Sequence, residues 1–205
     1  MKVGQVKSQF VAVASIAAEL SAVMGVAKEI SLAAANAKAI AFRAGEKAKG
    51  FQPITDFINE LAKDTIELVD GINEHALSLY QLTINEYRAT DAYNKFEMVV
   101  AQSKNARFAE SLEHPLLLVQ QNRVECRRDF KMSVEQLQEQ LAEVMHPARA
   151  ARVIAANSRI EASQAGEYLQ SLQAVAESVD NAAQIIHDNV QRCQSALSVI
   201  RFVEG

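Results

Sequence analysis

One pair of side chains in the sequence has the spacing of a metal site. Glu143 and His146 lie three residues apart, and side chains at i and i+3 share a helix face. Helical bundles hold di-iron centres with two Glu-x-x-His motifs and further carboxylates that point inward. This sequence has no second copy of the motif, and His146 precedes Pro147, where a kink is expected. We interpret the pair as polar residues at a helix irregularity, and we predict no metal and no cofactor.

The other reactive side chains do not form a catalytic pattern. His75 follows Ile72 by three residues, which predicts a partly buried histidine with satisfied hydrogen bonds. The sequence shows no Ser-His-Asp arrangement, no glycine-rich phosphate loop and no paired cysteine cluster. Cys126 and Cys193 are interpreted as reduced thiols, which suit a cytoplasmic location. We therefore do not expect an enzyme.

The composition predicts the elements that would position any functional residue. Among 205 residues, 49% are apolar, and seven Gly and three Pro are too few for the many turns of an all-β protein. The net charge of -4 gives no reason to bind nucleic acid or anionic lipid over the whole surface. Polar residues interrupt the most apolar stretch, Phe10 to Ala27, so no membrane insertion is expected; a secretory signal is the alternative for that segment.

Apolar residues recur at alternating steps of three and four through the first segment. They are Val13, Ile16, Leu20, Val23, Ala27, Ile30, Ala34, Ala37, Ala41 and Ala44. Such steps average ~3.5 residues and keep one face of a helix, here called its seam, against a partner helix. The seam stops at Gly45, Gly50 and Pro53 and resumes as Ile54, Ile58, Leu61, Thr65, Leu68 and Ile72. A helix, a turn and an antiparallel helix are predicted.

The second helix is expected to continue to about Leu112, where Pro115 would end it. Its seam drifts in phase after Leu77. The helix beyond Pro115 is expected to be interrupted near Asp129, and Ser133-Val-Glu-Gln136 has the spacing of a capping box that would restart it.

A second seam repeats the first at an offset of 121 residues. Its members are Val134, Leu137, Leu141, Val144, Ala148, Ala151, Ala155, Ser158, Ala162 and Ala165. The string NAKAIAFRAGE (36–46) also recurs as NSRIEASQAGE (157–167). We predict one elongated all-α domain over 1–205, a duplicated hairpin. Repeat 1 spans about 5–113 with its tip at 45–52, and repeat 2 spans about 122–203 with its tip at 165–169.

The region around the first tip resembles the cytoplasmic signalling hairpin of methyl-accepting chemotaxis proteins, the bacterial chemoreceptors. Positions that match the tip pattern of that family are Asn36, Ala37, Ala41, Arg43, Ala44, Gly45, Glu46, Gly50, Phe51, Leu61 and Ala62. The similarity covers about residues 20–70 and is fainter over 144–180, where the corresponding tip residues are Asn157, Glu161, Gly166 and Glu167.

The resemblance implies a long antiparallel four-helix bundle, which that family builds from two hairpins of a dimer. Its tips contact other receptors, a coupling protein and a histidine kinase. The resemblance implies that Asn36 and Arg43 face neighbouring bundles, that Gly45 and Glu46 make the turn, and that Phe51 lies near the coupling-protein surface. From the residues alone, two interpretations of Asn36 and Asn157 are open. They are either ordinary polar residues on a helix surface, or amides that set the register between paired helices or contact a partner at the tip.

The chain departs from the family pattern at Lys28, Ile40, Phe42, Ala48 and Pro53. Lys28 adds a charge where the family has an apolar contact, and Pro53 changes the backbone on the contact face. The helix arms carry no convincing methylation pairs. These departures argue against a normal receptor trimer.

Two architectures are compatible with the second repeat. If the chain bends near Gly166, two hairpins form a pseudo-dimer, a four-helix rod with both tips at one end. Alternatively, the seam runs unbroken into Leu169, Leu172 and Ala176 as one helix. We favour the bend. The expected function is that of a soluble chemoreceptor-like signalling protein that binds the coupling protein, the kinase or receptor tips. The sequence is also compatible with homo-oligomers. The alternative is a helical interaction module outside chemotaxis.

Overall fold

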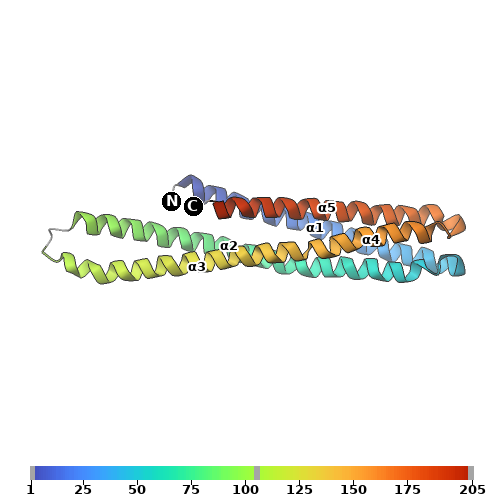
Figure 1. The fold of residues 1–205 in the computed structure, drawn as a ribbon, viewed down its shortest axis with the longest axis horizontal. Coiled ribbons are helices and arrows are strands. Elements are labelled where there is room, and N and C mark those ends of the chain that lie inside the picture. The colour runs from blue at the N-terminus through green and yellow to red at the C-terminus, as the bar shows by residue number, and fades with distance from the viewer. Residues whose placement is uncertain (1–2, 104–106, 203–205) are drawn as a thin grey trace.

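The computed structural model describes residues 3–103 and 107–202, which form a long rod of α-helices (Figure 1). The α-helices are α1 (Val3–Ala44), α2 (Phe51–Gln102), α3 (Glu113–Glu143), α4 (Met145–Ala162) and α5 (Leu169–Phe202). Short 3₁₀ turns lie at Gly45–Ala48, Ala109–Leu112 and Gly166–Tyr168. The described residues contain no strand, and the predicted all-α bundle is confirmed.

The helices pack as two antiparallel hairpins laid side by side. α1 packs on α2 and α5, while α4 packs on α5 and α2. α3 continues the direction of α4 and packs mainly along α2 (Figure 1). Both hairpin turns lie at the same end of the rod, and the loop between α2 and α3 lies at the other end.

The two sequence seams form most of the core. Every member of the first seam is buried except Ala44, which is half-buried, and every member of the second is buried. Near the tips the buried seam residues are mostly alanines, which let the helix backbones approach closely. Farther from the tips, Ile16, Leu20, Leu137 and Leu141 fill a wider core.

The buried face of α2 agrees with the predicted one at Ile58, Thr65 and Ile72 and differs from it at the positions between them. Thr55, Ala62 and Val69 are in the core, whereas the predicted Ile54 and Leu61 lie half-buried at its edge. Threonine tolerates burial because its hydroxyl can bond to its own helix: Thr55 Oγ1 donates to the Gln52 carbonyl oxygen at 2.7 Å. At these positions an apolar side chain precedes a small buried one, so periodicity selected Ile54, Leu61 and Leu68, each one residue before the buried residue.

Two predicted helix boundaries are wrong. α2 ends at Gln102, before the expected Leu112, and Pro115 lies in the first turn of α3. Proline fits a first turn because the amide hydrogen that it lacks would have no partner there. α3 is not interrupted near Asp129, and Ser133 is buried inside this helix. Ser133 does not cap a helix. Its hydroxyl instead lies 2.9 Å from Nε2 of His75, on the neighbouring helix α2.

The arm formed by α3 and α4 is irregular at the expected kink. α3 ends at Glu143 and α4 begins at Met145, with Pro147 close behind. Pro147 has no amide hydrogen to donate to the carbonyl four residues earlier, so regular hydrogen bonding lapses here. Pro147 is buried and faces the core, which it helps to fill.

Candidate functional site: the paired hairpin tips

Both tips turn at a glycine in the left-handed region of the backbone. Gly45 has a φ of 59° and Gly166 a φ of 61°, and these are the positive φ values among the described residues. A residue with a Cβ is strained in this conformation, so the shared Ala-Gly-Glu of the two repeats has a direct structural cause. Because the chain turns at Gly166, the second repeat is a hairpin and not one continuous helix.

The two tips touch each other. The carboxylate of Glu161, on α4, lies against the backbone of Gly50, at the start of α2. The Lys47 side chain crosses in the other direction, with Cδ 3.8 Å from the point that a Cβ on Gly166 would occupy. The tips therefore form one continuous surface, contributed by both repeats.

The structure places the sequence-predicted site residues mainly on this surface. Asn36, Arg43, Gly45, Glu46, Asn157, Gly166 and Glu167 are exposed, and Glu161 is half-buried between the tips. Phe51 is the exception, because only 1% of it is exposed. The expectation that Phe51 lies at a partner surface is therefore wrong. Its side chain is part of the buried core, just past the first turn.

Three exposed apolar side chains near the tips were not recognised as site residues from the sequence. Phe42 is 79% exposed, Phe57 56% and Ile160 63%. Phe42 lies three residues before the first turn, and the others lie on α2 and α4 near their tip ends. None of the three falls on the apolar spacing that marks the buried face of its helix. This mismatch predicts an exposed apolar side chain and could have identified each residue from the sequence. We use the name tip surface for these three residues and the exposed predicted residues above.

Ion pairs fasten each hairpin close to its turn. Lys38 Nζ lies 2.6 Å from Asp56 Oδ1, and Arg159 Nη2 lies 2.6 Å from Asp180 Oδ2. Lys38 and Arg159 occupy equivalent positions, 121 residues apart, so both repeats use a cation at this level. Arg152 also approaches Asp180, with Nε 3.7 Å from Oδ1. These links join the two helices of each hairpin behind the tip surface.

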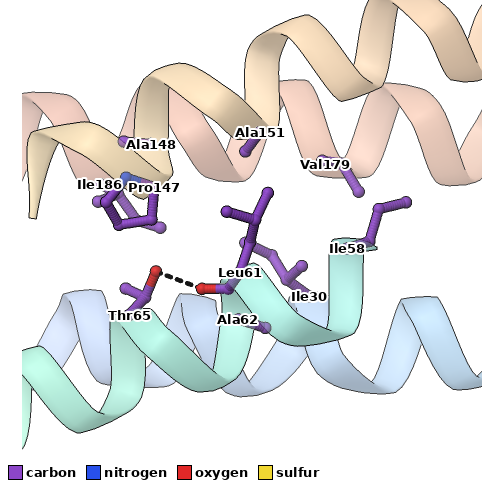
Figure 2. A pocket seen from close by; sticks show the side chains of 10 residues that line it. All are labelled: Ile30, Ile58, Leu61, Ala62, Thr65, Pro147, Ala148, Ala151, Val179 and Ile186. Carbon is purple, nitrogen blue, oxygen red and sulfur yellow. Dashed lines mark hydrogen bonds between the residues drawn. The ribbon is translucent and has the colours of Figure 1, made fainter. Parts of the chain in front are cut away.

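The interior offers little room for a substrate. A cavity of about 10 Å³ lies at the α3–α4 break, among apolar side chains that include Pro147, Ile30 and Ile58 (Figure 2). This is about the space of one water molecule. A larger open hollow of about 360 Å³ lies between α1 and α5, lined in part by Glu29, Glu177 and Ile185.

No metal cluster is present among the described residues, since no three His, Cys, Asp or Glu side chains come together. Glu143 and His146 are both exposed at the helix break. His75 is half-buried as predicted, and both ring nitrogens have partners: Nδ1 lies 2.7 Å from Gln140 Oε1, and Nε2 contacts Ser133. A neutral ring that donates from Nδ1 would accept the Ser133 hydroxyl at Nε2.

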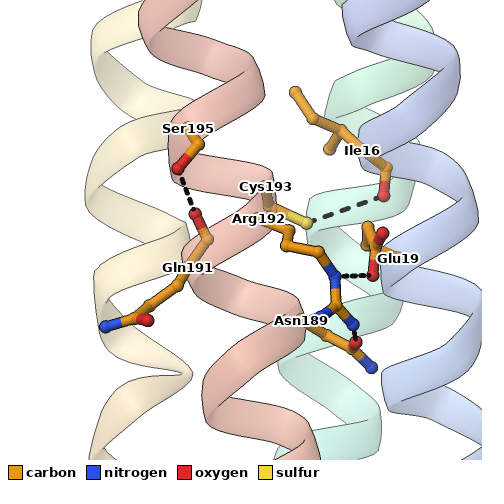
Figure 3. Close-up of polar contacts among 7 residues, drawn as sticks. All are labelled: Ile16, Glu19, Asn189, Gln191, Arg192, Cys193 and Ser195. Carbon is orange, nitrogen blue, oxygen red and sulfur yellow. Dashed lines mark hydrogen bonds and ion pairs between the residues drawn. The ribbon is translucent and has the colours of Figure 1, made fainter.

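A polar cluster ties α5 to α1 away from the tips (Figure 3). Arg192 Nε donates to Glu19 Oε2 at 2.9 Å, and the same guanidinium contacts the Asn189 side-chain oxygen. Beside it, Cys193 Sγ lies 3.8 Å from the carbonyl oxygen of Ile16. Burial, together with the nearby Glu19 carboxylate, raises the pKa of the Cys193 thiol to about 12, so this thiol is neutral and unreactive.

The first helix is more apolar than its interrupted sequence suggested. Residues Gln9–Ala48 are long and apolar enough to cross a membrane by length and composition, with a mean hydropathy of 2.0 over the most apolar window. Alanine dominates this segment and counts as apolar. The same property is found in core helices and signal sequences, and here the α1 seam packs on α2 and α5.

Comparison of the chain with protein-family models, with curated proteins and with solved structures finds no match in any of the three.

Proposed function

We propose that the protein is a chemoreceptor-like signalling scaffold of the cytoplasm that acts through its tip surface. The partners would be the chemotaxis coupling protein, a histidine kinase or receptor tips. The observation that carries the proposal is the position of the two glycine turns: both repeats bend at one end and present their Ala-Gly-Glu turns on one surface. In the family that the sequence resembles, a pair of hairpins does the same.

The chemistry of the tip surface supports protein binding. Phe42, Phe57 and Ile160 are large apolar side chains exposed to solvent, with Arg43 and Glu46 nearby in sequence. Exposed aromatic and arginine side chains contribute most of the energy in many protein interfaces. The rigid hairpins behind them limit the entropy lost on binding.

Substitution of Phe42 tests the proposal directly. Phe42→Asp is expected to weaken binding to the purified coupling protein about tenfold or more, measured by calorimetry, while the protein stays folded because this ring packs on little. Leu77→Asp is the matched control, since Leu77 is 62% exposed on α2, far from the tips. An absence of binding by the unmodified protein to the coupling protein, the kinase and receptor tips would overturn the proposal.

A second function is a helical interaction module outside chemotaxis. The buried Phe51 and the exposed Lys28 favour it, since neither presents the apolar contact that the receptor family uses. In that case the tip surface would bind a partner unrelated to chemotaxis, and the same Phe42→Asp variant would reduce its recovery from a cell extract.

A further inference from the structure

The two hairpin tips carry opposite charge, although they occupy equivalent positions of the repeat. Residues 40–51 contain three basic side chains and one acidic one, which gives a net charge of +2. The equivalent residues 161–172 contain two acidic side chains and no basic one, which gives a net charge of -2. Because the tips touch at one end of the rod, the tip surface has a positive half on the first hairpin and a negative half on the second (Figure 1).

Divergence of the repeats accounts for this difference. Each basic residue of the first tip is neutral in the second, and the equivalent pairs are Arg43 and Gln164, Lys47 and Tyr168, and Lys49 and Gln170. The second tip has also gained an acid, since Glu161 occupies the position of Ile40. The acid that the tips share differs in its surroundings: Glu46 Oε1 lies 3.3 Å from Lys49 Nζ, whereas Glu167 has a glutamine in place of that lysine.

The charges that remain can meet a partner. Arg43 and Lys47 in the positive half and Glu167 in the negative half are all exposed. None of the three forms an ion pair with another described residue. Charges arranged in this way steer association and fix its orientation more than they strengthen it.

We propose that the tip surface docks on the tip surface of a second copy of this chain, so that two rods meet end to end. The partner has to be negative opposite the first hairpin and positive opposite the second, with the same spacing between the two patches. A second copy meets this requirement by symmetry. A two-fold axis in the plane of contact, along the boundary between the hairpins, places each positive half on the negative half of the other copy.

This arrangement matches both halves of each copy in one closed pair. A parallel neighbour at the side of the rod would match one half at a time, and a contact between two positive halves would be repulsive. Apolar contact can add to the charges, because Phe42, next to Arg43, is 79% exposed and Tyr168, next to Glu167, is half-buried. Arginine and aromatic side chains contribute strongly to many interfaces.

The end of the rod offers a small area. Four helices packed two by two, about 10 Å apart, present an end of ~400 Å² from each copy, which is the size of a weak and transient contact. We therefore expect a dissociation constant of about 0.1 mM at low salt and weaker pairing at high salt. The pairing does not depend on the proposed function, since it needs no other protein; a partner that binds the tip surface would compete with it.

Sedimentation velocity over about 5–500 μM tests the pairing, with the monomer mass of 22.5 kDa as reference. In about 20 mM salt the unmodified protein is expected to shift from monomer to dimer, and in about 300 mM salt it should stay mostly monomeric. By symmetry, Lys47→Glu and Glu167→Lys each place two repulsive contacts in the dimer. Either variant alone should raise the dissociation constant at least about tenfold.

The charge-swapped variant Lys47→Glu/Glu167→Lys is the decisive measurement. It should pair about as well as the unmodified protein, and so should an equimolar mixture of the two single variants. Lys28→Glu and Glu29→Lys are the matched controls, because they make the same changes of net charge at exposed positions of α1 away from the tips and should leave pairing unchanged. Thermal unfolding at about 5 μM checks the fold of each variant and measures any effect of the two positions within one chain.

Small-angle scattering gives the geometry of the dimer. α2 has 52 residues and is ~78 Å long, so two rods that meet at their tips span more than ~150 Å, whereas rods side by side keep the length of one. General repulsion between acidic chains would make Glu167→Lys strengthen association. That result, a low-salt dimer of one rod length, a protein that stays monomeric up to 500 μM, or a charge-swapped variant that does not pair would each refute the proposal.

Discussion

Glu161 lies with its carboxylate against Gly50, so the end of one hairpin packs directly on the beginning of the other hairpin's return helix. The contact needs a residue without a side chain at position 50. Gly50 itself has an ordinary helical φ of -66°, so its role here is to give space and not to supply a special backbone conformation. The contact joins residues 111 positions apart in the sequence and makes the tip surface a product of both repeats.

Gly50→Ala is expected to push the Glu161 side chain aside at little energetic cost. The carboxylate is the free end of a flexible side chain, so the free energy of unfolding should change by less than about 1 kcal/mol. Chemical denaturation of the single variant and of Gly50→Ala/Glu161→Ala measures the coupling between the two positions. A loss above about 2 kcal/mol in the single variant would show that Glu161 cannot move.

Substitution by alanine should have opposite effects on stability at the two turn glycines and at the two glycines inside helices. Gly45→Ala and Gly166→Ala each force a Cβ into the left-handed region and are expected to lower the free energy of unfolding by about 1 kcal/mol. Gly25 and Gly71 lie inside helices, and a Cβ there meets nothing within 4 Å. Gly25→Ala and Gly71→Ala should therefore stabilise the protein by up to about 1 kcal/mol. Equal effects at all four positions would contradict this account.

Phe51→Ala should be strongly destabilising, by about 3–5 kcal/mol, because it empties a buried site beneath the first turn. Thermal unfolding followed by circular dichroism measures the loss. Phe57→Ala serves as the control: this ring is mostly exposed, and its removal should cost less than about 1 kcal/mol.

The two cysteines should differ in reactivity. Burial raises the pKa of both thiols, but Cys126 is half-buried whereas Cys193 is fully enclosed, with a pKa of about 12. In the native protein at pH 8, a thiol reagent should modify Cys126 slowly and should reach Cys193 only after unfolding. Mass spectrometry of the labelled protein distinguishes the two sites.

The raised pKa of Cys193 also predicts a pH dependence. The folded protein holds this proton more tightly than the unfolded chain, so the stabilisation is present below about pH 9 and is lost as the pH rises towards 12. Cys193→Ala should show a smaller loss of stability over this range than the unmodified protein. Parallel slopes for the two proteins would mean that other groups account for the whole effect.

The ion pairs behind the tips should contribute modestly and unequally. Lys38 and Asp56 are about 60% exposed, so Lys38→Ala should cost at most about 0.5 kcal/mol. Asp180 is 31% exposed and is shared by two arginines, so Arg159→Ala should cost somewhat more, up to about 1 kcal/mol. Double-mutant cycles with Asp56→Ala and Asp180→Ala isolate each pair. The difference between the stability losses of the two variants should become smaller at high salt.

Much of the fold could be predicted because a seam of small and branched apolar residues repeats twice. Where that pattern is regular, as from Val13 to Ala41, the buried residues are those that the spacing indicates. Periodicity alone does not decide whether the chain bends at Gly166, because the apolar spacing continues unchanged through the turn. The match of that residue with Gly45 in the other repeat was the better guide.

The remaining errors come from packing that no local pattern encodes. The position of Pro115 permits either the end of one helix or the beginning of another, and the structure uses the second. Phe51 was placed at a surface by resemblance alone, while its burial depends on how closely alanine-lined helices approach. Phe57 and Ile160 were overlooked because isolated exposed apolar residues are common and become informative only once both tips are seen together.

The first and last helices run antiparallel, and their outer ends lie close together part-way along the rod (Figure 1). A force that separates these two ends would therefore unzip α1 from α5 turn by turn, starting at the outer ends and proceeding towards the tips. The Arg192–Glu19 bond, which joins α5 to α1, would be among the first polar links to break, whereas the ion pairs behind the turns join helices within one hairpin and would stay intact. Mechanical load applied at the outer ends of α1 and α5 would thus reach the hairpin tips only after most of that helix pair had opened.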